Sequence, residues 1–509
     1  MGLVRKELLR PDRSATSGAE AFRFRHILVR DAAYAALPKE QRADLHARFA
    51  DWLERIAGDR LLEYEEVIAY HLEQAHHYRS ELGLADELTS LLGSRAAARL
   101  RAAGTRAWAR HDAPAADNLI SRAVDLLGDT LEHRKLTLLL SAVALDKGDF
   151  PRTRALLADA SQAADRAGDE LVRTHAEMLA AQVALLTDPN VDEERLLTLS
   201  ATTEALAIES SDLRARVEAL QVRALVSVNR CRFGDMLAAL EEALPLLQGQ
   251  DPESQLLRRD VQDGICGAVC YGPTSASAGI ARIDQVASAE TGLPLGKYLN
   301  APMLLAMQGK GDEARRLIQA GIEYVDERGL VSRRGNFAVT KAAVELFAGD
   351  LEAAQHSYAE AIAIWEALGA TSYLSTLAAV RAIVLYQLGR TEEMGEAIRL
   401  ARENGSPTDI ATQGAWRVAA AQRAADEGRR VEAEQLIGEA IALVEPTDFL
   451  ELRGRVFAAH AHIEARAGRV AGWHSALDRA LAEHERKGNL VDAKRIRDIM
   501  SSQPPAAVA

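Results

Sequence analysis

An internal repeat of about 40 residues constrains this chain more than any other feature of its sequence. Between residues 345 and 500, four glycines each stand before an Asp or Arg, and they are spaced 40, 39 and 40 residues apart. The four pairs are Gly349-Asp350, Gly389-Arg390, Gly428-Arg429 and Gly468-Arg469. A period of this size is typical of helical-repeat arrays, in which each repeat is one supersecondary unit.

Each repeat carries the apolar pattern of an amphipathic helix after its glycine. The apolar positions are Tyr358, Ile398, Ile437 and Leu477, followed four residues later by Ile362, Ile441 and Leu481, the last three each preceded by an alanine (Ala361, Ala440, Ala480). Four-residue spacing places such side chains on one face of a helix, and the small alanine leaves room for a neighbouring helix. The pattern places Leu481 on the buried face and Glu483 off it. Because one hairpin cannot bury this face alone, successive repeats are predicted to stack.

Composition favours a fold built only from helices. Apolar residues make up 48% of the 509 residues, but aromatic residues only 5%, so alanine and leucine supply the core. Both are strong helix formers, and the chain has only 14 prolines. A solenoid also avoids the size limit of a single core, because each repeat contacts only its neighbours. The sequence therefore predicts an all-α, TPR-like helical-repeat solenoid.

Charge and cysteine content narrow the possible partners and compartment. The net charge of −13 argues against a nucleic-acid surface, which requires a basic stripe. The three cysteines, Cys231, Cys266 and Cys270, are few and odd in number, which indicates free thiols in a reducing compartment. Residues 1–10 carry charges instead of a signal-peptide core, and no apolar run of 18 residues occurs. We therefore predict a cytoplasmic protein with no nucleic-acid or membrane partner.

Residues 1–50 differ from the repeats. We expect Leu3–Pro11 to end a helix and enter a turn. Phe22 and Phe24 alternate with arginines, as in a short strand, although no partner strand is evident in the sequence. A helix is expected to begin near His26 and to end before Pro38.

The early repeats are less regular than the later ones. Their predicted pivots are Gly148-Asp149, Gly234-Asp235 and Gly311-Asp312. The stretch Gly264–Leu299 is rich in glycine and proline, which predicts a kink or an irregular loop in the solenoid.

The segment Arg25-His26-Ile27-Leu28-Val29-Arg30-Asp31 resembles the end of the winged-helix domain in STAND-type signalling ATPases. In many of these a Met-His-Asp motif leads into Leu-Val-Arg-Asp-like residues. Arg25 and Ile27 stand here in place of the Met and the Asp. Later segments extend the resemblance to bacterial regulators that are often fused to class III adenylate cyclase domains or LuxR-type activators. These segments are 45–54, 65–75, Tyr271–Thr274, Tyr373–Leu377, Thr447–Leu450 and Glu485–Asn489.

The resemblance covers nearly the whole chain and implies its domain organisation. It implies a winged-helix remnant at 1–50, linker helices at 51–130, TPR-like repeats at 131–500 and a disordered tail at 501–509. No Gly-x-x-x-x-Gly-Lys-Ser/Thr motif is present, so the sequence lacks a P-loop for nucleotide phosphates. The resemblance therefore implies a non-catalytic interaction or sensor arm without its own ATPase or cyclase domain. Its implied partner is a protein, such as a STAND ATPase or cyclase module.

Two other functions stay open at the level of sequence. The first is a small-molecule receptor that uses the 264–299 region as a pocket. The second is a regulator whose ATPase acts in trans. In the resembled ATPases the histidine that matches His26 contacts the phosphate of bound ADP. His26 would then serve an ATPase on another chain, or else it packs or pairs with Asp31.

No catalytic, metal or cofactor site is predicted. His71 and His76 are five residues apart, which places them on different sides of a helix, and His77 adds no zinc-site spacing. Cys266 and Cys270 lack further ligands nearby, so we expect buried thiols. A solenoid instead offers a concave groove lined by the first helix of each pair. Its candidate partner-binding residues are Tyr373, Arg381, Tyr386, Trp416, Arg417 and Arg453, because aromatic and Arg side chains anchor partners.

Overall fold

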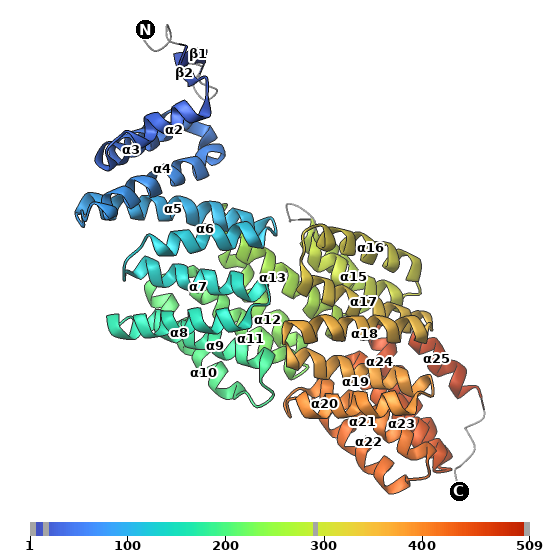
Figure 1. The fold of residues 1–509 in the computed structure, drawn as a ribbon. Coiled ribbons are helices and arrows are strands. Elements are labelled where there is room, and N and C mark those ends of the chain that lie inside the picture. Colours follow the sequence, from blue (N-terminus) through green and yellow to red (C-terminus); the bar gives the residue numbers. More distant parts are fainter. Residues whose placement is uncertain (1–6, 14–19, 289–293, 503–509) are drawn as a thin grey trace. The chain divides into compact units, whose positions relative to one another are not determined.

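The computed structural model describes residues 7–13, 20–288 and 294–502, and it divides the chain into two compact units. Unit 1 comprises Met1–Val143 and unit 2 comprises Ala144–Ala509 (Figure 1). Nearly all described residues lie in helices, so the predicted all-α, TPR-like helical-repeat solenoid is confirmed. In the described parts, no helix combines the length and the apolar character that a membrane crossing needs. Residues 503–509 of the predicted tail lie outside the described residues.

Unit 1 begins with a β-hairpin and continues as helices. Strand β1 (Leu9–Arg13) pairs antiparallel with β2 (Glu20–Phe24), and Leu9 lies opposite Phe24. The expectation of a strand without a partner is therefore wrong, as is that of a helix end at Leu9–Pro11. The helices are α2 (Ile27–Ala35), α3 (Lys39–Ala57), α4 (Leu61–Glu81), α5 (Glu87–Ala109) and α6 (Ala113–Asp125), with the short η1 (Gly58–Arg60) between α3 and α4 and with α7 (Leu131–Asp146) at the unit boundary.

Unit 2 is a run of antiparallel helices of similar length (Figure 1). Its first half contains α8 (Phe150–Ala167), α9 (Glu170–Thr187), α10 (Glu193–Ser210), α11 (Leu213–Asn229), α12 (Phe233–Ala243), η2 (Leu244–Leu246), α13 (Pro252–Tyr271), α14 (Ala276–Ala287), α15 (Leu295–Met307) and α16 (Gly311–Glu327). Its second half contains α17 (Val331–Ala348), α18 (Leu351–Leu368), α19 (Thr371–Gln387), α20 (Thr391–Asn404), α21 (Ile410–Asp426), α22 (Arg430–Val444), α23 (Leu450–Arg466), α24 (Val470–Lys487) and α25 (Leu490–Met500).

The four glycines that define the sequence period all lie in turns between helices. Their φ angles are 83° at Gly349, 70° at Gly389, 75° at Gly428 and 72° at Gly468, so each adopts the predicted left-handed conformation. Gly148 does the same, at 76°. Two of the early pivots are wrong, because Gly234 and Gly311 lie inside the starts of α12 and α16. The left-handed residues there are Cys231 and Gly309, with φ of 49° and 77°.

The buried face of each repeat is centred on its alanine. Ala361, Ala440 and Ala480 are fully buried, whereas Leu481 and its counterparts are only half-buried. Positions three and four residues beyond Ala480 share its face, so Glu483 is buried and its carboxylate pairs with Arg453 at 2.6 Å. The prediction that Glu483 faces solvent is therefore wrong.

The glycine-rich region is mostly helical. Its glycines allow helices to approach closely: a Cβ at Gly264 would lie 2.9 Å from Leu240, and one at Gly279 would lie 2.9 Å from Leu304. The prediction of an irregular loop is wrong for the described part, and residues 289–293 lie outside it. All three cysteines are free and buried, and burial raises the pKa of Cys270 to about 12.

Distant repeats of unit 2 join along a line of contacts that we call the seam. Asp448 accepts hydrogen bonds from the backbone amides of Phe233 and Gly234, both at 2.7 Å, at the start of α12. Lys487 is fully buried and donates to the carbonyls of Val269, Gly272 and Thr274 at 3.3, 2.7 and 2.9 Å. The seam, defined by the residues just named, connects α23 and α24 to α12–α14.

Aromatic packing completes the seam. The Phe449 ring lies 5.2 Å from Phe233 and 5.8 Å from Tyr271, measured between centroids. Three segments that carry the STAND resemblance, Tyr271–Thr274, Thr447–Leu450 and Glu485–Asn489, thus meet here. Their role in this structure is to hold the array against itself.

Candidate functional site

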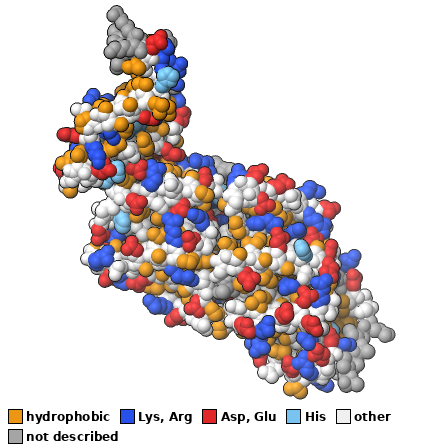
Figure 2. All heavy atoms as spheres, viewed as in Figure 1, with side chains coloured by type: hydrophobic (Ala, Val, Ile, Leu, Met, Phe, Trp, Pro, Cys, Tyr) orange, Lys and Arg blue, Asp and Glu red, His pale blue; other side chains and the backbone are white. Residues whose placement is uncertain are grey.

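The outward face of β2 and α2 is unusually apolar. Helix α2 has no buried residue, and the side chains of Ile27 and Leu28 are 65% and 77% exposed. Phe22 and Phe24 on β2 are also exposed. We call these four residues the α2 surface. In Figure 2, apolar side chains are frequent on the visible face of unit 1.

His26 lies at the start of α2 and is exposed. Its side chain makes no capping hydrogen bond, and Asp31 pairs with Arg30 at 2.6 Å instead of with His26. Arg25 pairs with Glu7 at 3.6 Å, so a carboxylate already meets part of the local positive charge.

The predicted histidines of α4 point to separate partners. His71 Nδ1 lies 2.7 Å from His46 Nδ1, and the His46 Nε2 atom lies 2.7 Å from the Tyr34 hydroxyl. Burial and the neighbouring His46 lower the pKa of His71 to about 4, so this pair shares one proton between neutral rings. His76 contacts the Thr89 carbonyl at 2.9 Å, while His77 pairs with Glu81 at 3.0 Å.

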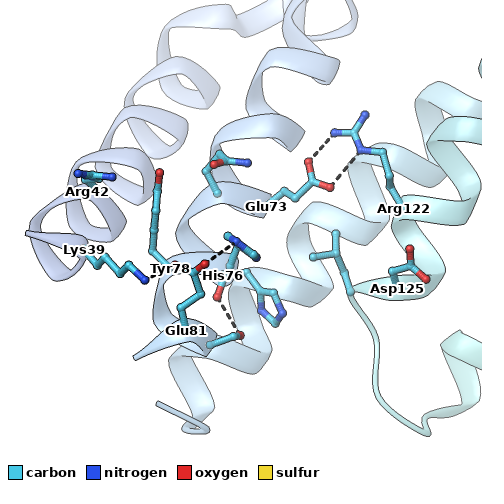
Figure 3. Close-up of a pocket in the computed structure, with 12 residues that line it drawn as sticks. Lys39, Arg42, Glu73, His76, Tyr78, Glu81, Arg122 and Asp125 are labelled. Atoms are coloured by element: carbon cyan, nitrogen blue, oxygen red, sulfur yellow. Dashed lines mark hydrogen bonds and ion pairs between the residues drawn. The ribbon is translucent and has the colours of Figure 1, made fainter. Parts of the chain in front are cut away.

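A pocket of about 620 Å³ lies beside this chain of rings in unit 1 (Figure 3). Its charged walls are largely neutralised by pairs across helices. Arg122 on α6 donates to Glu73 on α4 at 3.0 Å, and Lys39 pairs with Glu81 at 3.0 Å. These charges join helices, and no set of groups arranged for proton transfer emerges from them.

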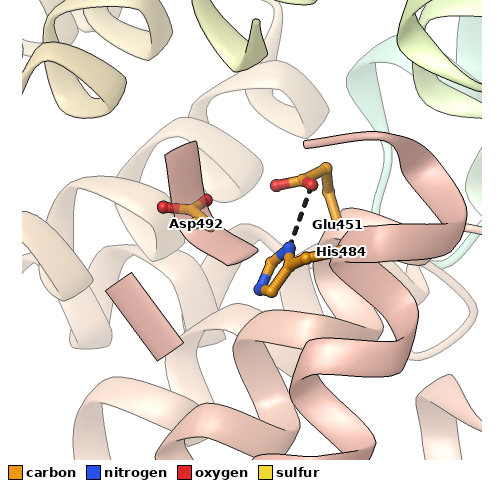
Figure 4. A group of neighbouring side chains, drawn as sticks. All are labelled: Glu451, His484 and Asp492. Atoms are coloured by element: carbon orange, nitrogen blue, oxygen red, sulfur yellow. Dashed lines mark hydrogen bonds and ion pairs between the residues drawn. The ribbon is translucent and has the colours of Figure 1, made fainter. Parts of the chain in front are cut away.

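A buried group at the C-terminal end contains Glu451, His484 and Asp492, whose ligand atoms lie within 4.8 Å of one another (Figure 4). It does not fit a metal ion, because the Asn489 amide occupies the space between the carboxylates. The Asn489 NH₂ donates to Glu451 at 2.8 Å and to Asp492 at 3.0 Å. Arg495 donates to Asp492 at 2.8 Å and adds positive charge. The group is a hydrogen-bonded cap for α25.

The His484–Glu451 pair predicts a pH dependence. Burial opposes charge on both groups, but their hydrogen bond of 3.2 Å and mutual attraction raise the pKa of His484 and lower that of Glu451. Asp492 favours the charged His484, and Arg455 opposes it. A raised histidine pKa stabilises the fold below its unfolded value, about 6.5, and this contribution is lost as pH rises through the folded pKa. The Glu451 contribution is present above about 4.5 and is lost as pH falls.

We expect His484→Gln to flatten this dependence. Glutamine keeps a hydrogen-bond donor near Glu451 but cannot titrate. Thermal melting of the native protein should lose stability from about pH 6.5 to 8, relative to the variant. Equal slopes for both proteins over that range would contradict the charged pair.

Four of the six predicted partner-binding residues make contacts within the array. Tyr386 donates to Asp426 at 2.5 Å, Arg381 pairs with Glu393 at 3.2 Å, and the Tyr373 ring stacks on Trp365 at 4.5 Å. Arg453, as described above, pairs with Glu483. Arg453 also donates to the carbonyls of the α22–α23 turn.

The other two, Trp416 and Arg417, line a groove of about 490 Å³ between α20 and α22, with α21 at its base. We call it the α20–α22 groove. Its residues are Gly395, Ile398, Arg402, Trp416, Arg417, Ala420, Arg423, Arg429, Glu432, Gln435, Leu436 and Glu439. Arg402, which sequence reasoning missed, lies 5.1 Å from the Trp416 ring centroid, and Arg417 lies 4.3 Å from it. The only sequence signal for Arg402 was its position on a repeat helix.

No protein-family model matches the chain, and no curated protein matches its sequence. Among solved structures, it is similar to Cut9 in the Cut9–Hcn1 hetero-tetramer, at 15% identity over 92% of each chain with a TM-score of 0.48. It is also similar to a Rap protein complexed with Competence and Sporulation Factor, at 14% identity over 72% of this chain and 98% of that one, with a TM-score of 0.43. Human IFIT1 with PPP-AAAA gives 12% identity, 92% and 96% coverage, and a TM-score of 0.43. At these values no ligand or partner transfers to this chain.

Proposed function

We propose that the chain is a non-catalytic, cytoplasmic scaffold that binds a protein partner through the α2 surface. The observation that carries this proposal is the exposure of α2, which buries none of its residues. An apolar surface of adjoining side chains marks an interaction site more often than a solvent-facing one. The seam gives further support, because residues bonded along it are occupied within unit 2 and partners must use other surfaces.

We further propose that this partner is the nucleotide-binding domain of a STAND-type regulator, supplied by another chain. The resemblance of residues 25–31 motivates this choice. The exposed His26 at the N-terminus of α2 supports it, because helix N-termini and histidine both favour a phosphate group. His26 would then contact ADP held by the partner, and the chain needs no cofactor of its own. The small-molecule alternative gains no support, since α13–α15 fill the 264–299 region with buried side chains.

Replacing both Ile27 and Leu28 with glutamate is expected to weaken partner binding at least tenfold, since it places charge in the centre of the interface. Val431→Glu on α22 is the matched control, because Val431 is 79% exposed and lies on unit 2. Isothermal titration of the full chain with an ADP-loaded STAND nucleotide-binding domain measures the effect. His26→Ala should reduce the difference in affinity between the ADP-loaded and empty domain.

Two results would contradict the proposal. One is the absence of binding with and without ADP. The other is equal binding by the double variant and the native chain. Binding to a cyclase module but not to the nucleotide-binding domain would keep the scaffold and replace its partner.

A further inference from the structure

The α20–α22 groove is cationic although the protein is acidic. Four arginines and two glutamates line it, whereas the whole chain carries a net charge of −13. Arg417 pairs with Glu439 at 2.9 Å, Arg423 pairs with Glu427 at 2.8 Å, and Arg429 also pairs with glutamates. Among the described residues, Arg402 alone of the four has no carboxylate partner. A local excess of positive charge therefore resides on one guanidinium.

The surroundings of Arg402 hold that guanidinium in place. It lies over Trp416, whose side chain is only 8% exposed and whose indole donates to Gln413 at 3.2 Å. A guanidinium stacked on an aromatic ring keeps its N–H donors free at its edge. A planar fork of this kind matches a carboxylate with two parallel hydrogen bonds.

Apolar side chains lie next to this cation. Ile398, Ala420 and Leu436 are half-buried and line the same groove. An occupant that satisfies both features carries a carboxylate beside an apolar side chain. A folded globular surface presents such a pair less readily to a narrow groove than an extended segment does.

We propose that the α20–α22 groove binds an acidic peptide segment of a protein partner, with Arg402 receiving an Asp or Glu carboxylate and Ile398 and Leu436 contacting a neighbouring apolar side chain. This inference rests on the proposed scaffold function, but it concerns a surface on unit 2 instead of the α2 surface. The two proposals can therefore fail separately.

Fluorescence anisotropy with the full chain tests the groove. The probe is a fluorescein-labelled Glu-Leu-Glu-Glu-Leu-Glu peptide at 0.15 M salt, and the same peptide with Gln for each Glu is the comparison. We expect saturable binding of the acidic peptide and binding about tenfold weaker for the Gln peptide, as for loss of a charged hydrogen bond. Arg402→Glu should weaken binding of the acidic peptide by about tenfold or more.

Arg399→Glu is the matched control, because Arg399 is an exposed residue of α20 that does not line the groove. It makes the same change in net charge and should leave affinity unchanged, and circular dichroism should show both variants folded. The proposal is overturned by no saturable binding, by equal binding of the two peptides, or by equal effects of Arg402→Glu and Arg399→Glu. The Ile27→Glu/Leu28→Glu variant should bind the peptide normally, so failure of the α2 proposal would remain distinguishable.

Discussion

Replacing Lys487 with methionine is expected to lower the free energy of unfolding of the C-terminal repeats by about 3 kcal/mol. The Lys487 ammonium is fully buried and donates to three carbonyls from the α13–α14 turn. Methionine keeps most of the side-chain volume but leaves those carbonyls without their donor. Buried polar groups without partners destabilise a fold more than the lost bond alone would suggest.

Chemical denaturation followed by tryptophan fluorescence measures this loss, and hydrogen exchange locates it. Lys494→Met is the matched control, because Lys494 is exposed on α25, and its effect should stay within about 0.5 kcal/mol. Equal effects of the two substitutions would show that Lys487 does not hold the seam.

Replacing Asp448 with alanine should lower the free energy of unfolding by about 2 kcal/mol, at the upper end of the range for helix caps. Its two carboxylate oxygens accept the amides of Phe233 and Gly234, which are the first residues of α12. No residue of the local α11–α12 turn caps this helix with a side chain, since Arg232 at the N-cap makes no such bond.

Hydrogen exchange should show faster exchange at residues 233–236 in Asp448→Ala, because their amides then lack acceptors. Asp478→Ala on the exposed face of α24 provides the same chemical change away from the seam. Unchanged exchange at the start of α12 would contradict the assigned cap.

Much of the fold follows from local patterns in the sequence. The glycine period predicted the turns at Gly349, Gly389, Gly428 and Gly468, because a left-handed residue at a helix end is a local requirement. The same rule missed Cys231, since a non-glycine residue rarely takes a positive φ and the sequence gives no sign of it.

The errors came from contacts between distant repeats. Glu483 looked solvent-facing because its only compensation is Arg453 on another helix. The glycines of α13 and α14 looked like helix breakers because Leu240 and Leu304, which they accommodate, are distant in sequence. The partner of β2 was hidden because β1 contains Pro11, which is uncommon within strands.

The candidate site was predictable only in part. Aromatic and arginine residues at repeat positions indicated Trp416 and Arg417, and the groove contains both. The engagement of Tyr386 with Asp426, and the availability of Arg402, depend on which neighbours each side chain finds after folding.

Hydrogen–deuterium exchange of the full chain, with and without the ADP-loaded STAND nucleotide-binding domain, tests the central claim most directly. The account predicts that added partner slows exchange at residues 22–34, which contain the α2 surface, and leaves the seam segments 231–236 and 269–274 unchanged. Protection confined to other regions, or no protection at residues 22–34 with the partner in excess, would contradict it.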